Sequence, residues 1–210
     1  MKLVQEGSIY VHLDQNGIEI GRYYYIFKEG YLKSVSEYFV ATEEPCLSPK
    51  DLNRVKWSLY SIESGRVSDH FDWVHTNGIV KGQSPYYKGT KGKYEALYTL
   101  EGKVSDDFEK IRDRGALTGE SRFFWGKKNG KFAIYNILTG ERLTEEYRSS
   151  VIAGVVIGKG DYYVGSYGDE MFYIFDIKTG ERLTRAFDEH RLIEILKHGN
   201  LVKAVEELGK

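Results

Sequence analysis

An internal repeat is the feature that most constrains how this chain of 210 residues can fold. Residues 134–144 align with residues 174–184 at an offset of 40, and eight of these eleven pairs are identical. Fainter copies of the segment begin at Tyr25, Leu59 and Leu97. Because self-similarity at a period of about 20 to 50 residues is the signature of stacked structural units, we expect an array of repeats.

The match extends well beyond this one segment. A turn glycine closes each copy, at spacings of 35, 37, 38 and 40 residues: Gly30, Gly65, Gly102, Gly140 and Gly180. Three copies also share a motif of two aromatic residues, one variable residue and a glycine, at residues 86–89, 123–126 and 162–165. Agreement at so many positions excludes coincidence.

Each copy can be divided into strands. In the last copy, residues 155–157, 162–164 and 171–175 are short runs of β-branched and aromatic residues between Gly, Asp and Lys clusters, a pattern typical of strands. Asn129-Gly130 and Thr179-Gly180 predict tight hairpin turns, and Arg182 begins a fourth strand. Four short strands in about 40 residues is the period of a β-propeller blade.

The segment from Asp161 to Glu181 resembles the β-propeller repeat of the pyrroloquinoline-quinone family. The resemblance covers residues 69–184 well and residues 1–68 poorly. The family repeat usually carries a tryptophan after the turn, near the place where this chain has Leu143 and Leu183. The resemblance therefore implies the blade architecture. No cofactor-site pattern accompanies it, and no cofactor is expected.

We therefore predict an all-β fold, a small β-propeller of about five four-stranded blades over residues 1–184, followed by a helical tail over residues 185–210. The predicted repeats are 1–36, 37–68, 69–105, 106–144 and 145–184. The second repeat is the weakest, because a loop around Pro45 interrupts it and residues 51–55 fit a short helical turn. A closed ring is favoured because it removes long exposed edges, and an open stack of hairpins is the alternative.

After Phe187 the period of the apolar residues changes. Asp188 and Asn200 can each cap a helix, and Gly199 can end the first one. The predicted apolar faces consist of Leu192, Ile195 and Leu196 in the first helix and of Leu201, Val202, Val205 and Leu208 in the second. Residues 198–209 resemble the first half of a Fis-type helix-turn-helix, but the resemblance stops before the recognition helix that enters a major groove. A helical hairpin packed on the propeller or on a partner is the favoured interpretation.

Charge and composition narrow the classes of partner. Thirty Lys and Arg residues against 31 Asp and Glu residues leave a net charge of −1, unlike the basic balance of a general nucleic-acid binder. One cysteine excludes a disulfide framework, and no apolar run approaches the roughly 18 residues of a membrane span. No signal peptide is visible, so a cytoplasmic protein is expected. Few Met, Gln, Asn and Cys residues among many charges indicate a thermophilic source.

Two hairpins combine aromatic and basic residues at equivalent positions of their repeats. The candidate binding residues are Tyr86, Tyr87, Lys91, Phe124, Trp125, Lys127 and Lys128, together with Trp73 from a histidine-containing segment. Aromatic rings beside cations can stack on single-stranded nucleic acid, and exposed Tyr and Trp are typical anchors of protein interfaces. The favoured interpretation is that the rings pack between blades and the lysines lie on the turns.

No catalytic residue and no metal ligand is predicted. Residues 69–75 hold His70 and His75, but strand alternation places these two side chains on opposite faces, whereas metal ligands must converge. Acidic pairs recur at 106–107 and 145–146, which favours a structural role because catalysis breaks repeat symmetry. No signature of a nucleophile surrounds Cys46.

The sequence therefore predicts a non-enzymatic protein-interaction scaffold built on a β-propeller, with another protein as its partner. Two alternatives stay open. One is a nucleic-acid-associated protein that uses the Lys–aromatic hairpins or the helical tail, which salt-dependent binding would indicate. The other is a carbohydrate-binding or glycoside-hydrolysing propeller, which loss of activity on changing one carboxylate would indicate.

Overall fold

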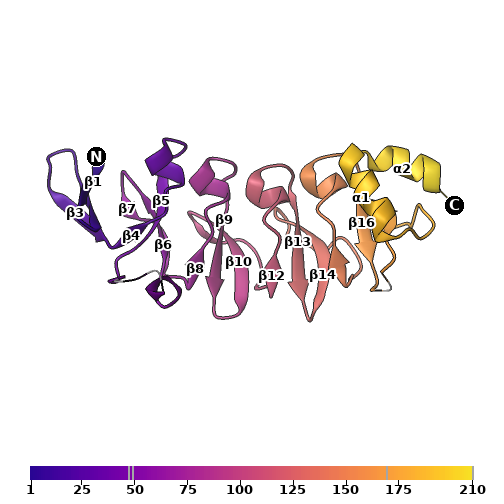
Figure 1. The fold of residues 1–210 in the computed structure, drawn as a ribbon, viewed down its shortest axis with the longest axis horizontal. Helices are drawn as coiled ribbons and strands as arrows, with labels where there is room; N and C mark the ends of the chain where they lie inside the picture. Colours follow the sequence, from indigo (N-terminus) through magenta and orange to yellow (C-terminus); the bar gives the residue numbers. More distant parts are fainter. Residues whose placement is uncertain (47, 49, 169, 210) are drawn as a thin grey trace. The chain divides into compact units, whose positions relative to one another are not determined.

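The computed structural model describes residues 1–46, 48, 50–168 and 170–209. In these residues the chain is mostly β, with five small antiparallel sheets, five short 3-10 helices and a C-terminal pair of α-helices (Figure 1). It divides into two compact units, Met1–Ser105 and Asp106–Lys210, which are described one at a time. The prediction of an all-β chain of five small sheets with a C-terminal helical hairpin is confirmed.

The first unit contains three sheets. The first has the order β1 (Lys2–Glu6), β2 (Ile9–Leu13) and β3 (Glu19–Tyr23). The second has the order β4 (Tyr25–Ile26), β5 (Tyr38–Thr42), β6 (Ser58–Ser61) and β7 (Gly65–Arg66). The third has the order β8 (Trp73–Val74), β9 (Tyr87–Lys91), β10 (Tyr94–Thr99) and β11 (Gly102–Lys103). Three 3-10 helices lie in the connections: η1 (Gly30–Lys33), η2 (Asp51–Asn53) and η3 (Gly78–Lys81).

The second unit contains two sheets and the helical pair. The fourth sheet has the order β12 (Lys110–Ile111), β13 (Phe123–Lys128) and β14 (Lys131–Asn136), and the fifth has the order β15 (Ser149–Ser150), β16 (Tyr162–Ser166) and β17 (Tyr173–Asp176). In place of the fourth strand predicted from Arg182, each sheet has a single bridge, Tyr135 to Arg142 and Phe175 to Arg182. The helices are η4 (Gly115–Thr118), η5 (Gly154–Ile157), α1 (Glu189–His198) and α2 (Leu201–Leu208).

The boundary between the first and second sheets lies earlier in the chain than residue 36, the predicted end of the first repeat. Since β4 pairs with β5, the second sheet begins at Tyr25. Gly30 is therefore not the turn glycine of the first copy; it begins η1 with a φ of +77°. The helical turn predicted at residues 51–55 is confirmed, because η2 covers Asp51–Asn53.

The hairpin turns share a side-chain cap. In the first sheet, Oδ1 of Asp14 accepts the backbone N–H of Asn16 at 2.8 Å. In the fifth, Oδ1 of Asp176 accepts the backbone N–H of Lys178 at 2.7 Å. A short polar side chain that accepts a hydrogen bond from the backbone two residues ahead stabilises a tight turn. The turn that begins at Asp14 is therefore the first copy's equivalent of the turn that begins at Asp176.

A hydroxyl group closes four of the repeats. The backbone N–H groups of Leu59, Leu97, Ile134 and Ile174 donate to the hydroxyl oxygens of Ser68, Ser105, Thr144 and Thr184 at 2.8, 2.9, 3.1 and 3.0 Å respectively. The hydroxyl satisfies a backbone donor that would otherwise be unpaired inside the sheet. This bond explains why each copy ends in an aliphatic residue followed by Ser or Thr.

An aromatic ring covers the glycine of the shared motif in the last three sheets. The pairs are Phe71 on Gly89, Phe108 on Gly126 and Tyr147 on Gly165. A Cβ atom would stand 2.5 Å from the ring at Gly89 and at Gly126, and 2.7 Å from it at Gly165. These glycines are therefore required for close packing of a ring against the strand rather than for a turn.

The run Val155–Ile157, predicted as a strand, is the 3-10 helix η5. Gly154 has a φ of +56° and Gly158 a φ of +69°, so left-handed backbone bounds the run on both sides. An apolar run this short does not distinguish a strand from a helical turn by its periodicity, and the bounding glycines decide it.

The 3-10 helices also join neighbouring repeats within each unit. Cγ1 of Val80 in η3 lies 2.9 Å from the place of a Cβ at Gly30, and Cγ1 of Val156 in η5 lies 3.0 Å from that at Gly115. Oγ of Ser36 donates to the carbonyl oxygen of Val80 at 2.6 Å, which adds a polar link to the same junction. A side chain on one repeat therefore fills the space left by a glycine on the repeat before it.

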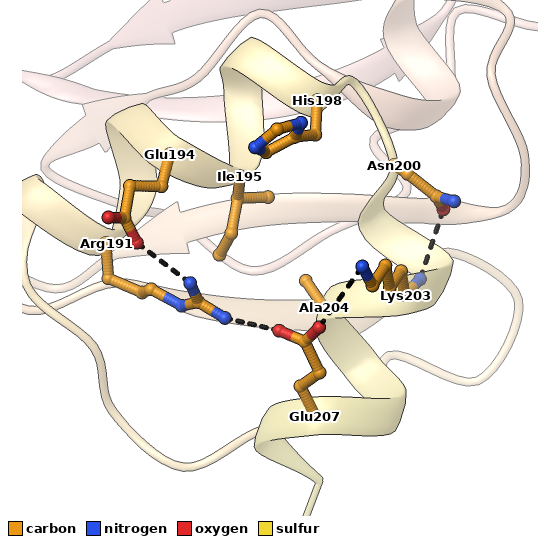
Figure 2. A pocket seen from close by; sticks show the side chains of 8 residues that line it. All are labelled: Arg191, Glu194, Ile195, His198, Asn200, Lys203, Ala204 and Glu207. Atoms are coloured by element: carbon orange, nitrogen blue, oxygen red, sulfur yellow. Dashed lines mark hydrogen bonds and ion pairs between the residues drawn. The ribbon is translucent and has the colours of Figure 1, made fainter.

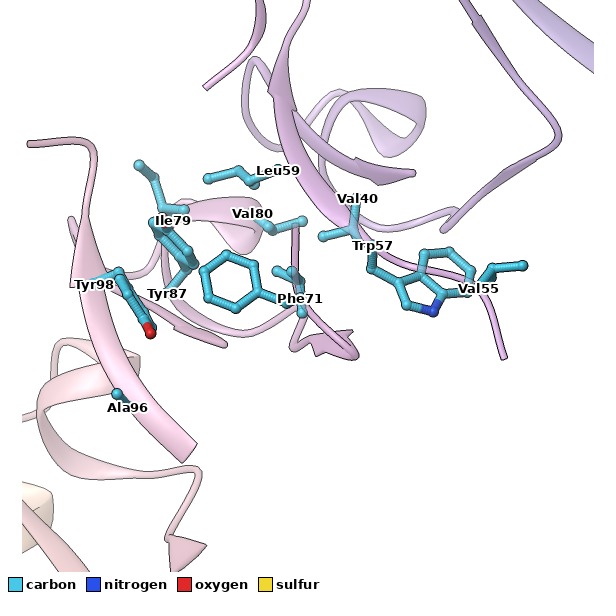
Figure 3. Close-up of a cluster of buried hydrophobic side chains, with 11 residues drawn as sticks. Val40, Val55, Trp57, Leu59, Phe71, Ile79, Val80, Tyr87, Ala96 and Tyr98 are labelled. Carbon is cyan, nitrogen blue, oxygen red and sulfur yellow. The ribbon is translucent and has the colours of Figure 1, made fainter. Parts of the chain in front are cut away.

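The second and third sheets share a core, in which side chains from both sheets meet (Figure 3). Val40 and Leu59 come from the second sheet, and Phe71 and Tyr87 belong to the third repeat. Trp57 is fully buried, and its Nε1 donates to the carbonyl oxygen of Leu52 in η2 at 3.2 Å. The repeat with the weakest sequence signal therefore contributes the largest side chain of this core.

The two predicted helices and their caps are confirmed. Oδ1 of Asp188 accepts the backbone N–H of Arg191 at 2.9 Å, Oδ1 of Asn200 accepts that of Lys203 at 3.1 Å, and left-handed Gly199 ends α1. The buried face consists of Leu192, Ile195, Leu201 and Ala204. Leu196 and Val202, predicted on the apolar faces, are exposed instead.

Candidate interaction site

Three of the predicted binding aromatics belong to the core. Tyr87, Phe124 and Trp125 are buried, and Trp73 and Tyr86 are half-buried. Nε1 of Trp125 donates to the carbonyl oxygen of Val151 at 3.0 Å. Because the three buried rings pack inside their units, they present no face on which a base or a partner could stack.

The lysines of the same hairpins have partners within their own repeats. Nζ of Lys91 lies 3.0 Å from Oδ2 of Asp69 and 4.8 Å from the ring centre of Phe71. Nζ of Lys128 lies 2.6 Å from Oδ2 of Asp106 and 4.7 Å from the ring centre of Phe108. The same carboxylate–cation–ring arrangement therefore occurs in two consecutive repeats, as expected of a structural contact.

The acidic residue that recurs at this position of the repeat also has a partner within its own repeat in the fifth sheet. In the fifth sheet, Tyr167 takes the place of the lysine, and its hydroxyl donates to Oε2 of Glu145 at 3.0 Å. Lys127 lies 5.6 Å from the ring centre of Phe132. A binding role for Lys91, Lys127 and Lys128 stays a prediction.

The histidine segment does not form a metal site in the part of the chain that the structure describes. Nη1 of Arg66 donates to Nε2 of His70 at 2.6 Å, so Nδ1 of His70 carries the proton and donates to Oγ of Ser58 at 3.0 Å. The ammonium group of Lys56 beside Asp72 holds the pKa of that carboxyl below its usual range. Both side chains are therefore engaged in local hydrogen bonds.

A buried ion pair in the third repeat was missed by the sequence analysis. Nζ of Lys88 lies 3.3 Å from Oε2 of Glu95, and Nε2 of the half-buried His75 lies 3.9 Å from Oε1 of Glu95. Lys88 is 0% exposed, and the matching residues of the fourth and fifth sheets are Trp125 and Val164. The available signal was the lysine at the variable position of the shared motif, where the other copies have apolar residues.

The lone cysteine has the environment of an unreactive thiol. Burial raises the pKa of Cys46, and the nearby carboxylates of Asp51 and Glu44 raise it further. A nucleophilic cysteine needs the opposite shift, because the thiolate is the reactive form.

The helical pair carries a cleft of about 140 Å³ between α1 and α2 (Figure 2). The cleft is lined by Arg191, Glu194, Ile195, His198, Asn200, Lys203, Ala204 and Glu207. Nη1 of Arg191 donates to Oε2 of Glu194 at 2.8 Å, and Nη2 of Arg191 donates to Glu207. Nζ of Lys203 lies 3.7 Å from Oε1 of Glu207, so one network of charges spans both helices.

Exposed aliphatic residues stand on the same two helices. Ile193 is 47% exposed, Leu196 39% and Val202 49%. The core under the helices is formed by other residues of α1 and α2, so these three are not needed to hold the pair in place. At 3.6 residues per turn these three residues lie on the sides of α1 and α2 away from the cleft, so the helical pair exposes a charged side and an aliphatic side.

Comparisons with known proteins give structural matches only. No family model and no curated protein matches the sequence. Similar solved structures include Hsv2 of Kluyveromyces lactis, at 11% identity and a TM-score of 0.42 over 89% of this chain, and the computationally designed protein Ika8, at 12% and 0.41 over 89%. A third is the WD40 β-propeller domain of Doa1, at 11% and 0.32 over 86%.

The chain spans less than two thirds of each of these structures, namely 58% of Hsv2, 60% of Ika8 and 62% of the Doa1 domain. The low TM-scores and identities assign no function to this chain. Among the described residues, none of the helices has the length and apolar character that crossing a membrane requires.

Proposed function

We propose that this chain is a non-enzymatic protein-interaction scaffold, in which the repeats form the framework and the exposed aliphatic side chains of α1 and α2 bind a partner protein. The observation that carries the proposal is that Ile193, Leu196 and Val202 stay exposed on one helical pair whose core is formed by other residues. Covering exposed aliphatic groups with a partner stabilises the complex by roughly 25 cal/mol per Å² of apolar area removed from water.

The repeats have the role of a framework because their recurring residues serve internal contacts. The hydroxyl groups that close the repeats, the rings over glycine and the lysines over rings all bond within the array. The helical pair is the part that departs from the repeat. A surface that differs from the repeated units is where we expect a specific partner to be recognised.

The matched test uses two sets of exposed leucine and isoleucine residues. Ile193→Glu with Leu196→Glu places charges on the helical pair, and Leu138→Glu places one on a turn of the fourth sheet, where Leu138 is 67% exposed. Because all three residues are exposed, both variants should fold like the wild type. A partner is captured with the wild-type chain after nuclease treatment, identified, purified and titrated against each protein by calorimetry.

We expect the partner to bind the wild type and Leu138→Glu with the same Kd, and to bind the double variant at least tenfold more weakly, about 1.4 kcal/mol or more. Equal binding of the double variant would contradict the role of the helical pair. Recovery of nuclease-sensitive material alone would replace the proposal with the nucleic-acid alternative.

A further inference from the structure

The first sheet lacks a strand that the other four sheets have. In each of these four sheets a short strand pairs with the outer edge of the first long strand: β4 with β5, β8 with β9, β12 with β13 and β15 with β16. In the first sheet the order is β1-β2-β3, and no residue that the structure describes pairs with the outer edge of β1. Unpaired N–H and C=O groups on an edge strand are a template for addition of another strand.

The register shows which groups of β1 are unpaired. Val4 lies opposite Val11 in the first sheet, as Gly126 lies opposite Ala133 in the fourth. On either side of Gly126, the carbonyl oxygens of β13 accept N–H groups from the β12 segment: Trp125 from Arg112 at 3.0 Å and Lys127 from Glu109 at 2.8 Å. The residues at the matching positions of β1 are Leu3 and Gln5, so their N–H and C=O groups point away from β2.

The other sheets also show what kind of residue fits beside Val4. Ile26, Val74 and Ile111 lie opposite three of the residues that match Val4 and are buried aliphatic side chains, and Ser150, which is also buried, lies opposite the fourth, Gly165. An added strand should therefore place a side chain that can be buried opposite Val4, where the side chains of a non-hydrogen-bonded antiparallel pair come close, and a valine meets this condition.

We propose that the occupant is β1 of a second copy of this chain, added antiparallel and centred on Val4. Val4 then faces Val4 of the other copy, and Leu3 faces Gln5 across two hydrogen-bonded pairs. Lys2, at one end of the strand, faces Glu6 at the other end of its partner, which forms two opposite-charge pairs between exposed side chains. The contact is its own complement, so it closes as a symmetric dimer.

This inference does not depend on the proposed role of α1 and α2, because it uses only the first sheet. The charge pairs give a reciprocal test by sedimentation velocity up to about 1 mM protein, the range of weak specific association. Any purification tag is placed at the C-terminus so that β1 stays unchanged. We expect the wild-type chain to dimerise with a Kd that rises with salt concentration.

Single charge changes should weaken the dimer and the double change should restore it. Lys2→Glu places two carboxylates opposite each other, and Glu6→Lys does the same with two ammonium groups. Each should raise the Kd about tenfold, and the variant with both substitutions should return it to the wild-type value. A wild-type chain that is monomeric throughout, or a double variant no tighter than the singles, would overturn the proposal.

A backbone substitution tests the hydrogen bonds directly. Gln5→Pro removes an N–H that points away from β2 and leaves the β1–β2 ladder intact, whereas Gln5→Thr keeps the N–H. We expect the dimer to be lost in the first variant and kept in the second. As a measurement that needs no variant, amide exchange at Leu3 and Gln5 of the wild type should slow with rising protein concentration, and unchanged exchange there would contradict the pairing.

Discussion

Leu201 packs on Gly154 in the way that one repeat packs on another. Cδ1 of Leu201 lies 2.6 Å from the place of a Cβ at Gly154, as Cγ1 of Val156 lies 3.0 Å from that at Gly115. The second helix of the tail therefore occupies the position at which the 3-10 helix of a further repeat would pack. This contact ends the series of repeats in the second unit and anchors the helical pair that we propose as the binding surface.

Leu201→Ala should detach this anchor. The side chain is buried, and removing a buried leucine costs about 2–5 kcal/mol. We expect denaturant melts to show that loss for the second unit, and amide exchange in α1 and α2 to quicken first. Val202→Ala is the control on the same helix, because Val202 is exposed; a loss of similar size there would contradict the anchor.

Gly126→Ala should destabilise the fourth sheet without any change of turn. The new Cβ would stand 2.5 Å from the ring of Phe108, so the ring must move, at a cost of about 1–3 kcal/mol. Chemical denaturation measures the loss. In a Phe108→Leu background no ring has to move, so the added cost of Gly126→Ala should be smaller, and an equal cost in both backgrounds would rule out the ring contact as its cause.

His12 should make the first unit less stable in mild acid. Burial holds the pKa of His12 below its usual value of about 6.5, and the hydrogen bond from Nε2 to the carbonyl oxygen of Ile62 at 2.7 Å offsets part of that shift. Since the unfolded chain takes up the proton first, stability falls as the pH drops below about 6.5 towards the folded pKa. Urea melts between pH 7.5 and 5.5 measure the effect.

His12→Leu is the control for that pH dependence. Leucine already stands at the matching position of the second sheet, Leu59, and it does not titrate. The variant should lose the part of the acid sensitivity that belongs to His12. An unchanged dependence on pH would show that His12 stays as easily protonated in the fold as in the unfolded chain.

Glu120 should contribute stability that disappears in stronger acid. The guanidinium of Arg114, the hydroxyl of Thr118 and the N–H of Gly115 hold the pKa of Glu120 at about 2. The contribution is complete above the unfolded pKa of about 4.3 and is lost as the pH falls from there to about 2. The stability difference between wild type and Glu120→Gln should therefore shrink over this range; a constant difference in denaturant melts would refute the assignment.

The parts of the fold that the sequence predicted are the ones that local rules decide. Asn129 and Gly130 both have positive φ and form the two-residue turn between β13 and β14. Asp188 and Asn200 cap the two helices, because each side chain accepts a hydrogen bond from the backbone N–H three residues ahead. These features depend only on neighbours in the chain, so a single copy of the sequence contains all the information they need.

The rest depends on packing between repeats. Tyr87 and Trp125 were candidate binding residues because aromatic and basic residues recur on equivalent hairpins, while the favoured interpretation packed these rings between blades; in the structure neighbouring elements bury both rings. Nothing local distinguishes Lys88 from the lysines of the turns. Its burial beside Glu95 follows from its place in the motif, which only comparison with Trp125 and Val164 reveals.

The ion pair of Lys88 and Glu95 is contained in one hairpin. The two residues stand on the paired strands β9 and β10, so the pair forms whichever repeat lies beside the third one. Taking two charges out of water together has a cost in free energy, and their attraction offsets it only while both residues are in place. The third repeat should therefore tolerate a change of neighbour better than a change at either of these two positions.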